Sequence, residues 1–216
     1  MYEFVTGPLV WISFIIFFIG MIVKTVSLIR LSKEKDKVVF NHLDAGWSFQ
    51  SIFFWLIPFG SRSMREKPVL TAFSFTFHIC LLATPIFLLA HNILWDERWG
   101  FSWWSLSETA TDYMTIIFLI AAIGLVLRRV IQPEVRIITT AYDFLLMLIA
   151  AAPFITGFLA YHQWGPYKAM LIIHILCGEI MLIAIPFTKL SHMILFFLTR
   201  AHIGSEMGQR REAKTW

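Results

Sequence analysis

The sequence has few charged residues for its length. Asp, Glu, Lys and Arg make up 15% of its 216 residues, whereas 58% are hydrophobic and the mean hydropathy is +0.70. A soluble domain of this size has about 25% charged residues and lacks long uninterrupted apolar runs. We find no nucleophile triad, phosphate-binding loop, zinc signature, internal repeat or low-complexity tract. These absences disfavour a soluble globular domain and indicate a membrane protein.

Cysteine is also scarce. The two cysteines, Cys80 and Cys177, both lie in apolar runs. They are too few for the four thiolates of an iron–sulfur cluster. We expect both to be small buried apolar side chains.

Five apolar stretches are long enough to cross a bilayer, which requires about 20 predominantly apolar residues. They cover residues 8–31, 69–94, 112–131, 137–162 and 167–199. The sequence therefore predicts an all-α integral membrane protein, a bundle of five transmembrane helices forming a single membrane domain over residues 1–216. The first stretch lacks the basic start and cleavage site of a signal peptide, so we expect it to be retained. The connection 32–68 becomes amphipathic over residues 47–56, which predicts a helix at the cytoplasmic interface or a surface for a partner subunit.

Basic residues are distributed unequally between the two sides of this topology. One side has only Arg98 and Lys168. The other side has Arg30, Lys33, Lys35, Lys37, Arg62, Arg65, Lys67, Arg128, Arg129, Arg136, Arg200, Arg210, Arg211 and Lys214. The positive-inside rule therefore places the N-terminus outside and the C-terminus inside. The net charge of +4 is accounted for by these basic residues on one side of the membrane. We therefore expect no nucleic-acid partner.

Four histidines lie in or near the predicted spans, where an ionisable side chain indicates function. His174 and His192 are 18 residues apart, which puts them on one helix face and roughly 27 Å apart along the axis. The antiparallel second helix sets His78 level with His192 and His91 level with His174. Facing helices of a bundle commonly supply cofactor ligands, so the pattern predicts two bis-histidine sites for b-type haem. Alternatively, single histidines of this kind hydrogen-bond a neighbouring helix.

Two histidines are candidate partners of His174. His78 and His91 are 13 residues apart, about 140° around a straight helix. Pro85 lies between them and can kink the helix and rotate the residues after it. His162, at the end of the fourth span, is the rival ligand, although we favour His91 because the same helix supplies His78.

Other polar residues have two interpretations each. Lys189, with Arg128 or Arg129, pairs with a haem propionate or extends to the lipid headgroups. Glu179 relays protons near a quinone or hydrogen-bonds a neighbouring helix. We expect Asp143 to cap a helix or to form an ion pair with Arg136, and His42 and His202 to be solvated. Four tryptophans in the connection 95–111 form an interfacial belt or a docking surface, namely Trp95, Trp99, Trp103 and Trp104.

Three segments resemble a known family. They are Phe77-His78-Ile79 with the preceding Arg65, Lys67 and Pro68; Arg136, Thr139, Thr140 and Asp143; and the stretch from His174 through Pro186-Phe187-Thr188-Lys189-Leu190-Ser191-His192. At these residues the chain resembles the gamma subunit of respiratory nitrate reductase, a dihaem cytochrome b. That family has its second ligand of this helix ten residues after the first, at Leu88 here, whereas His91 lies three residues further on. The sequences Phe77-His78-Ile79-Cys80 and Ala90-His91-Asn92 in this helix are most similar to those of the short cytochrome b subunits of transmembrane redox complexes in sulfate-reducing bacteria.

The resemblance implies an electron-transfer subunit of the bacterial inner membrane rather than an enzyme acting alone. It implies two haems b, a quinone such as menaquinone as substrate, and a quinone site near the outer haem at His91, Asn92 and His162. It also implies a cytoplasmic iron–sulfur subunit, a periplasmic multihaem cytochrome c and further membrane subunits as partners. The rival functions are a haem-free anchor for peripheral redox subunits and a small transporter, although no inverted repeat is visible.

Overall fold

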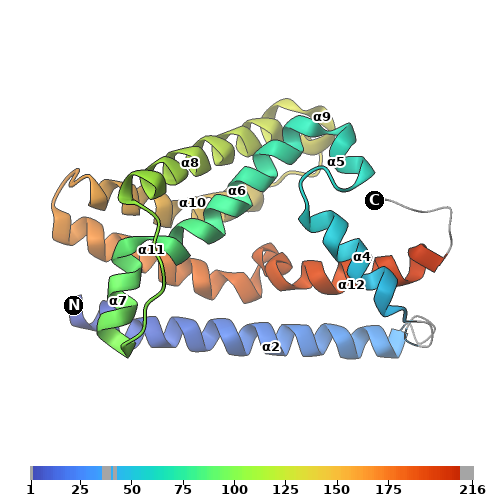
Figure 1. Ribbon diagram of the computed structural model, residues 1–216, viewed down its shortest axis with the longest axis horizontal. Helices are drawn as coiled ribbons and strands as arrows, with labels where there is room; N and C mark the ends of the chain where they lie inside the picture. Colours follow the sequence, from blue (N-terminus) through green and yellow to red (C-terminus); the bar gives the residue numbers. More distant parts are fainter. Residues whose placement is uncertain (1, 36–39, 41–42, 210–216) are drawn as a thin grey trace. The chain divides into compact units, whose positions relative to one another are not determined.

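The computed structural model describes residues 2–35, 40 and 43–209. The sequence-based assignments of Lys37, His42, Arg210, Arg211 and Lys214 lie outside these residues. All regular structure in the described part is helical, without strands. The elements are α1 (Tyr2–Phe4), η1 (Val5–Leu9), α2 (Val10–Lys35), α4 (Ala45–Leu56), α5 (Arg62–Glu66), α6 (Pro68–Phe87), α7 (Leu89–Trp99), α8 (Glu108–Ile131), α9 (Pro133–Arg136), α10 (Ala141–Tyr161), α11 (Tyr167–Phe187), η2 (Lys189–Ser191) and α12 (His192–Gln209) (Figure 1).

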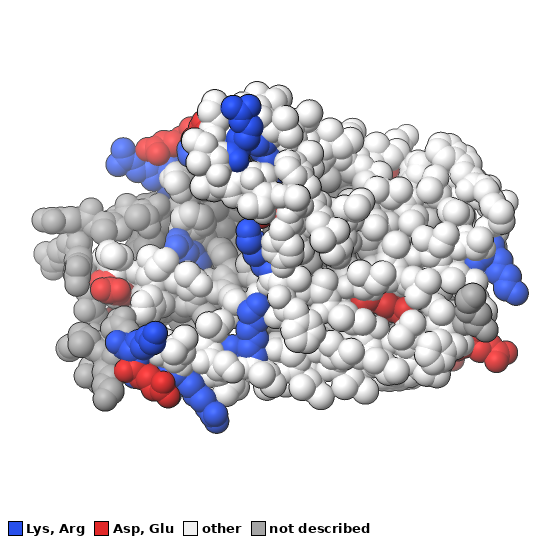
Figure 2. Space-filling model, turned by 180° about the vertical axis from the view of Figure 1, so that it is seen from behind, with Lys and Arg blue, Asp and Glu red and all other residues white. Residues whose placement is uncertain are grey.

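Five helical segments are long and apolar enough to cross a membrane. They are Tyr2–Lys35, Pro68–Phe87, Glu108–Ile131, Ala141–Tyr161 and Tyr167–Phe187. Many of their large apolar side chains are exposed on the isolated chain, Ile22 by 62% and Val69 by 67%. Most of the surface seen in Figure 2 carries no charged side chain, as expected where lipid rather than water is the solvent. The predicted helical, multi-pass membrane protein is confirmed.

Two of the predicted helices are broken. The helix predicted over 69–94 ends at Phe87 and resumes as α7 after Leu88, whose backbone is extended (φ −68°, ψ 127°). The helix predicted over 167–199 ends at Phe187, and η2 separates it from α12. In both cases the expectation of one continuous helix is wrong, because backbone donors and acceptors at the break find partners elsewhere in the chain.

Local hydrogen bonds set the other helix starts. Ser107 accepts a hydrogen bond from Ala110 N and begins α8 four residues before the predicted start. Thr140 and Asp143 form a capping box, in which Thr140 N donates to Asp143 Oδ2 at 2.9 Å. The helix predicted from residue 137 therefore begins at Ala141, and the capping role predicted for Asp143 is confirmed.

The described chain divides into two compact units. The central unit comprises residues 69–174, and the terminal unit comprises the described parts of 1–68 and 175–216. In the central unit, α6, α8 and α10 share a core in which the ring of Phe118 stacks between those of Phe77, at 4.7 Å, and Phe154, at 3.9 Å. Small residues complete this core, namely Cys80, Ala121, Ala122, Ala150 and Ala151. They let the helices approach closely.

In the terminal unit, α4 packs against α12, and the two helices lie side by side in Figure 1. Ser48 Oγ donates to Ala201 O at 2.9 Å, and Asp44 N donates to Ser205 Oγ at 2.8 Å. Gly204 lies against the side chain of Ser51, where a Cβ would clash. The amphipathic segment 47–56 is thus a helix, and α12 covers part of it.

Candidate functional site

Two of the predicted ligands face each other in the central unit. The imidazole of His91, in α7, and that of His174, in α11, have ring centres 6.1 Å apart and planes inclined by 22°. The structure therefore places His174 beside His91, the pairing that the sequence favours.

Both imidazoles are oriented by backbone carbonyls. His91 Nδ1 lies 2.9 Å from Pro85 O, and His174 Nδ1 lies 2.9 Å from Pro153 O. Because a carbonyl oxygen can only accept, each Nδ1 carries the proton and donates it. Each Nε2 then has a lone pair directed away from the carbonyl, which is the state a metal ligand requires.

The break at Leu88 explains the bond made by His91. In a continuous helix, Pro85 O would accept from the N–H of Leu89. Leu88 N still donates to Thr84 O at 2.9 Å, but the next helical bonds are absent. The freed carbonyl of Pro85 accepts from the imidazole instead, so the break that the sequence did not predict also orients His91.

Gly157, in α10, makes room for the imidazole of His174. A Cβ at this position would lie 3.0 Å from His174 Cε1 and 3.1 Å from Nδ1, which is tighter than ordinary van der Waals contact. Sequence reasoning did not link Gly157 to His174. Gly157 follows Pro153 by four residues and so lies on the same face of α10 as the carbonyl that accepts from His174. This spacing is the signal by which the sequence could have identified it.

His162, the rival ligand, makes a different contact. Its Nε2 donates to Asp112 Oδ1 at 2.9 Å, joining the end of α10 to α8. Beside it, Tyr161 Oη donates to Glu108 Oε2 at 3.2 Å. Sequence reasoning did not select Glu108, Asp112 or Tyr161; Asp112 and Tyr161 lie at the ends of predicted spans, and Glu108 lies four residues before one. The structure thus gives His162 a carboxylate partner and leaves the His91–His174 pair separate from it.

The other two predicted ligands also donate to backbone carbonyls. His78 Nδ1 lies 2.7 Å from Ser74 O in α6, and His192 Nδ1 lies 2.9 Å from Lys189 O in η2. His78 belongs to the central unit and His192 to the terminal unit. Their pairing around a second haem stays a prediction.

Five side chains in the described part of the chain have buried polar atoms without hydrogen-bond partners, those of Ser51, Trp55, Thr84, Asn92 and Glu179. Both amide atoms of Asn92, the hydroxyl of Thr84 and both carboxyl oxygens of Glu179 are in this state. Burying such groups unpaired is unfavourable. Asn92, next to His91 in the sequence, therefore has capacity for a hydrogen bond to a bound molecule.

No group of three or more His, Cys, Asp or Glu side chains gathers around a point in the described part of the chain. A haem iron needs only two axial protein ligands, because the porphyrin supplies the rest. The residues around His91 and His174 meet the requirements of such a group: two Nε2 lone pairs, a glycine beside one ring and unpaired polar atoms at Asn92.

No protein-family model matches the chain, and no solved structure matches it. A protein of Nitratidesulfovibrio vulgaris (strain Hildenborough) is 42% identical over 219 residues, an alignment that covers 100% of this chain and 97% of the relative. The chain belongs to the family of that protein. Identity at this level over both lengths means that family members share one helical fold. The relationship by itself assigns no activity to this family.

Proposed function

We propose that the chain is a b-type cytochrome subunit of a respiratory complex and carries electrons across the bacterial inner membrane. The His91–His174 pair is the observation on which this proposal rests. Two imidazoles bound on opposite sides of one metal, each at about 2 Å, would have ring centres about 6 Å apart. The observed separation is 6.1 Å.

Backbone carbonyls fix the tautomer and the orientation of the two proposed ligands. Pro85 O and Pro153 O hold both rings in the Nδ1–H tautomer, which fixes ring orientation and increases the basicity of Nε2. When bound, haem supplies the one-electron redox chemistry. Two histidine ligands leave no position open for dioxygen, so electron transfer rather than oxygen activation is the supported chemistry.

A second haem is proposed at His78 and His192, with Lys189 as a partner for a propionate. Both histidines donate Nδ1 to a backbone carbonyl, as His91 and His174 do. The resemblance to the nitrate reductase gamma subunit supports this assignment, because the segment from His174 to His192 is its most specific part, where ligand spacing and flanking residues match together. Two haems at different depths would carry electrons between the membrane faces.

The proposed substrate is a quinol, bound near His91. Asn92 offers a buried donor and acceptor without a protein partner, which suits a quinone oxygen. His162, whose Nε2 donates to Asp112 Oδ1 at 2.9 Å, is the second candidate for contact with the quinone. Glu179, buried without a partner, is the proton-exchange candidate.

The proposed topology has the N-terminus outside and the C-terminus inside, because basic residues concentrate on one side. The resemblance supports an iron–sulfur subunit at the cytoplasmic face, a multihaem cytochrome c at the periplasmic face and other membrane subunits. The chain would then be the quinone-reactive subunit of an oxidoreductase.

The test is haem quantitation on the detergent-purified chain or its complex. We expect about two haems b per chain, by pyridine haemochrome and reduced-minus-oxidised spectra, and about one in His174→Ala. His202→Ala is the matched control and should keep both, because this half-exposed histidine in α12 faces Glu206. Well-folded protein without haem would refute the proposal and leave a haem-free anchor.

A further inference from the structure

The end of α6 leaves three backbone carbonyls without their helical donors. In a continuous helix, Pro85 O, Ile86 O and Phe87 O would accept from the N–H groups four residues later. Those three bonds are absent, because Leu88 is extended and α7 begins a new hydrogen-bond ladder, with Asn92 N donating to Leu88 O at 3.1 Å. Unpaired backbone groups are costly at membrane depth, so such a break needs replacement donors.

Each of the three carbonyls has a replacement donor. Pro85 O accepts from His91 Nδ1 at 2.9 Å. Ile86 O accepts from the indole Nε1 of Trp103 at 2.8 Å. Phe87 O accepts from Leu106 N at 2.9 Å. The last two donors come from the connection between α7 and α8.

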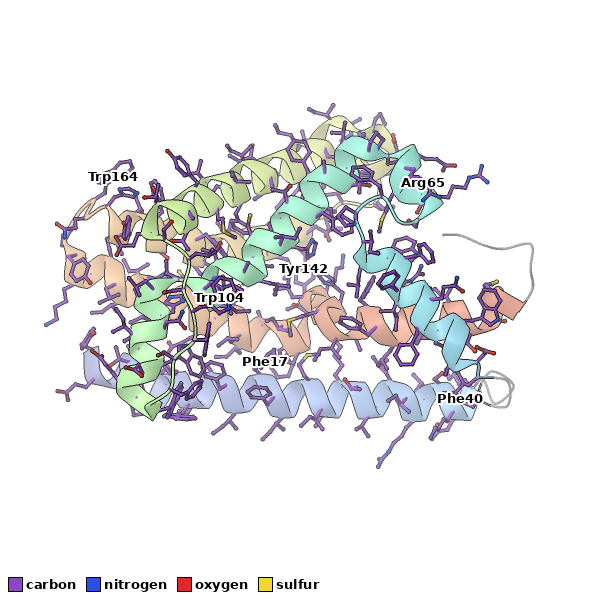
Figure 3. The ribbon with its side chains drawn as sticks, in the orientation of Figure 1. Phe17, Phe40, Arg65, Trp104, Tyr142 and Trp164 are labelled. Carbon is purple, nitrogen blue, oxygen red and sulfur yellow. The ribbon has the colours of Figure 1, made fainter. Side chains whose placement is uncertain are left out.

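We call this connection, residues 101–107, the strap. Gly100, with a left-handed φ of 68°, ends α7 and turns the chain into it. Trp104 stacks on Phe87, with ring centres 4.3 Å apart, and lies beside the end of α6 in Figure 3. The strap therefore contacts the end of α6 through one aromatic stack and two hydrogen bonds.

Local sequence does not account for the break. The residues after Pro85 are Ile86, Phe87, Leu88, Leu89 and Ala90. Leucine and alanine are strong helix formers, and no glycine or further proline is present. The chain would continue as a helix here unless its carbonyls were held elsewhere, and the strap supplies two of the three donors that hold them.

We propose that Trp103 is a positioning residue: by holding Ile86 O it maintains the break at Leu88 and thereby sets the orientation of His91. Without this donor, Ile86 O recovers the N–H of Ala90 and Pro85 O recovers that of Leu89. The imidazole of His91 then loses its acceptor and turns about the helix axis away from His174. The inference rests on the proposed function only in taking His91 as a haem ligand.

The first test measures the break without reference to haem. Spin labels on Leu82→Cys and Leu94→Cys, in a Cys80→Ala, Cys177→Ala background, report the distance across Leu88 by pulsed EPR. Both labelled sites are exposed. A continuous helix would separate their backbones by about 18 Å. We expect Trp103→Phe to shift the distance distribution of the wild type toward that of a continuous helix.

The second test measures whether His91 still binds haem in the proposed geometry. Loss of a group that orients a metal ligand weakens metal retention roughly tenfold or more. Trp103→Phe should therefore shift the low-field EPR signal of the haem proposed at His91 and His174 and reduce its occupancy, leaving the other haem unchanged. Trp55→Phe is the control, because Trp55 lies in α4 of the terminal unit, against the guanidinium of Arg200, and should change neither reading.

Leu106→Pro provides an independent variant, because it removes the donor to Phe87 O and leaves Trp103 in place. A shifted distance distribution in Trp103→Phe, absent in Trp55→Phe, supports the inference, and a similar shift in Leu106→Pro extends it to the whole strap. An unchanged distribution in Trp103→Phe overturns it. If the wild type holds no haem, the proposed function fails, while the spin-label distances still decide the role of the strap.

Discussion

Two predicted transmembrane helices are broken, and a predicted haem ligand comes within four residues of each break. In the central unit, α6 ends before Leu88 and His91 lies three residues beyond it. In the terminal unit, α11 ends before Thr188 and His192 begins α12. A proline precedes each break, at Pro85 and Pro186. In both cases the break redirects the chain just before the histidine.

The donors that satisfy the freed carbonyls differ between the two breaks. At Leu88 they are uncharged, and one of them is the ligand, since His91 Nδ1 donates to Pro85 O. At Thr188 a charged donor takes part: Lys24 Nζ, from α2, donates to Pro186 O at 3.0 Å and to Thr188 O at 3.2 Å, and Thr188 O also accepts from Ser191 Oγ at 2.8 Å. His192 instead donates to Lys189 O within its own turn. His91 therefore holds a carbonyl that its own break frees, whereas His192 donates to Lys189 O in η2 and not to the two carbonyls that Lys24 holds.

Replacing the two histidines by alanine should produce the largest effects. We expect His91→Ala and His192→Ala each to remove one of two haems, and the double variant to remove both. His91→Ala should also lower the free energy of unfolding, by about 1–3 kcal/mol, because it leaves Pro85 O unpaired, whereas in His192→Ala the backbone N–H of residue 192 still donates to Lys189 O. Haem quantitation and denaturation of the same preparations measure both quantities. Equal destabilisation by the two variants would contradict the comparison.

Lys24→Met tests the break in the terminal unit. It removes the charged donor to Pro186 O and Thr188 O, which should cost about 1.5–3 kcal/mol of stability. The visible spectrum of both haems should stay unchanged, because His192 does not contribute to this cap. Lys24→Arg keeps a cation and should recover most of the stability. A changed haem spectrum in Lys24→Met would show that this break too is coupled to its ligand.

Gly157→Ala should have a smaller effect, confined to the central unit. Its methyl group would lie 3.0 Å from His174 Cε1, so the ring must shift and haem retention should fall roughly tenfold. Gly178→Ala, in α11, is the matched control, because nothing lies within 4 Å of its added Cβ. Haem titration of both variants measures the difference, and equal affinities would argue against close packing around His174.

Asn92→Leu should change stability least. Replacing an unpaired buried amide by an apolar side chain of similar size is close to neutral. Haem content should therefore be preserved, while quinol-dependent haem reduction, followed by stopped flow, should slow about tenfold for one lost hydrogen bond. A marked loss of stability would mean that Asn92 has a structural role, and unchanged reduction kinetics would remove it from the quinone site.

The sequence predicted the spans better than their interruptions. Apolar runs of bilayer length identify five helical segments directly, because length and composition are local properties. The breaks at Leu88 and Thr188 depend on donors from Trp103, Leu106 and Lys24, which are distant along the chain from the carbonyls they hold or lie in separate elements. Propensity at Leu88, Leu89 and Ala90 favours a continuous helix, so tertiary contacts overrode the local signal.

The candidate site was predicted in the same uneven way. Depth matching along antiparallel helices brought His91 and His174 to one level, which agrees with the facing rings in the structure. Helical periodicity could not predict in which direction around the helix axis His91 points, because that direction depends on the break at Leu88. The His162–Asp112 bond joins residues 50 positions apart, and a single sequence contains no signal for such a pair.

The packing of α4 on α12 has a consequence for the timing of synthesis. The bond between Asp44 N and Ser205 Oγ joins residues separated by 161 positions. At about 5–20 residues per second, a ribosome needs roughly 10–30 s to make the intervening chain. During that interval α4 has none of the contacts that α12 later provides, so the apolar side chains on this face, Trp47 against Gly208 and Trp55 against Arg200, must be sheltered by lipid or by a chaperone until the last helix emerges.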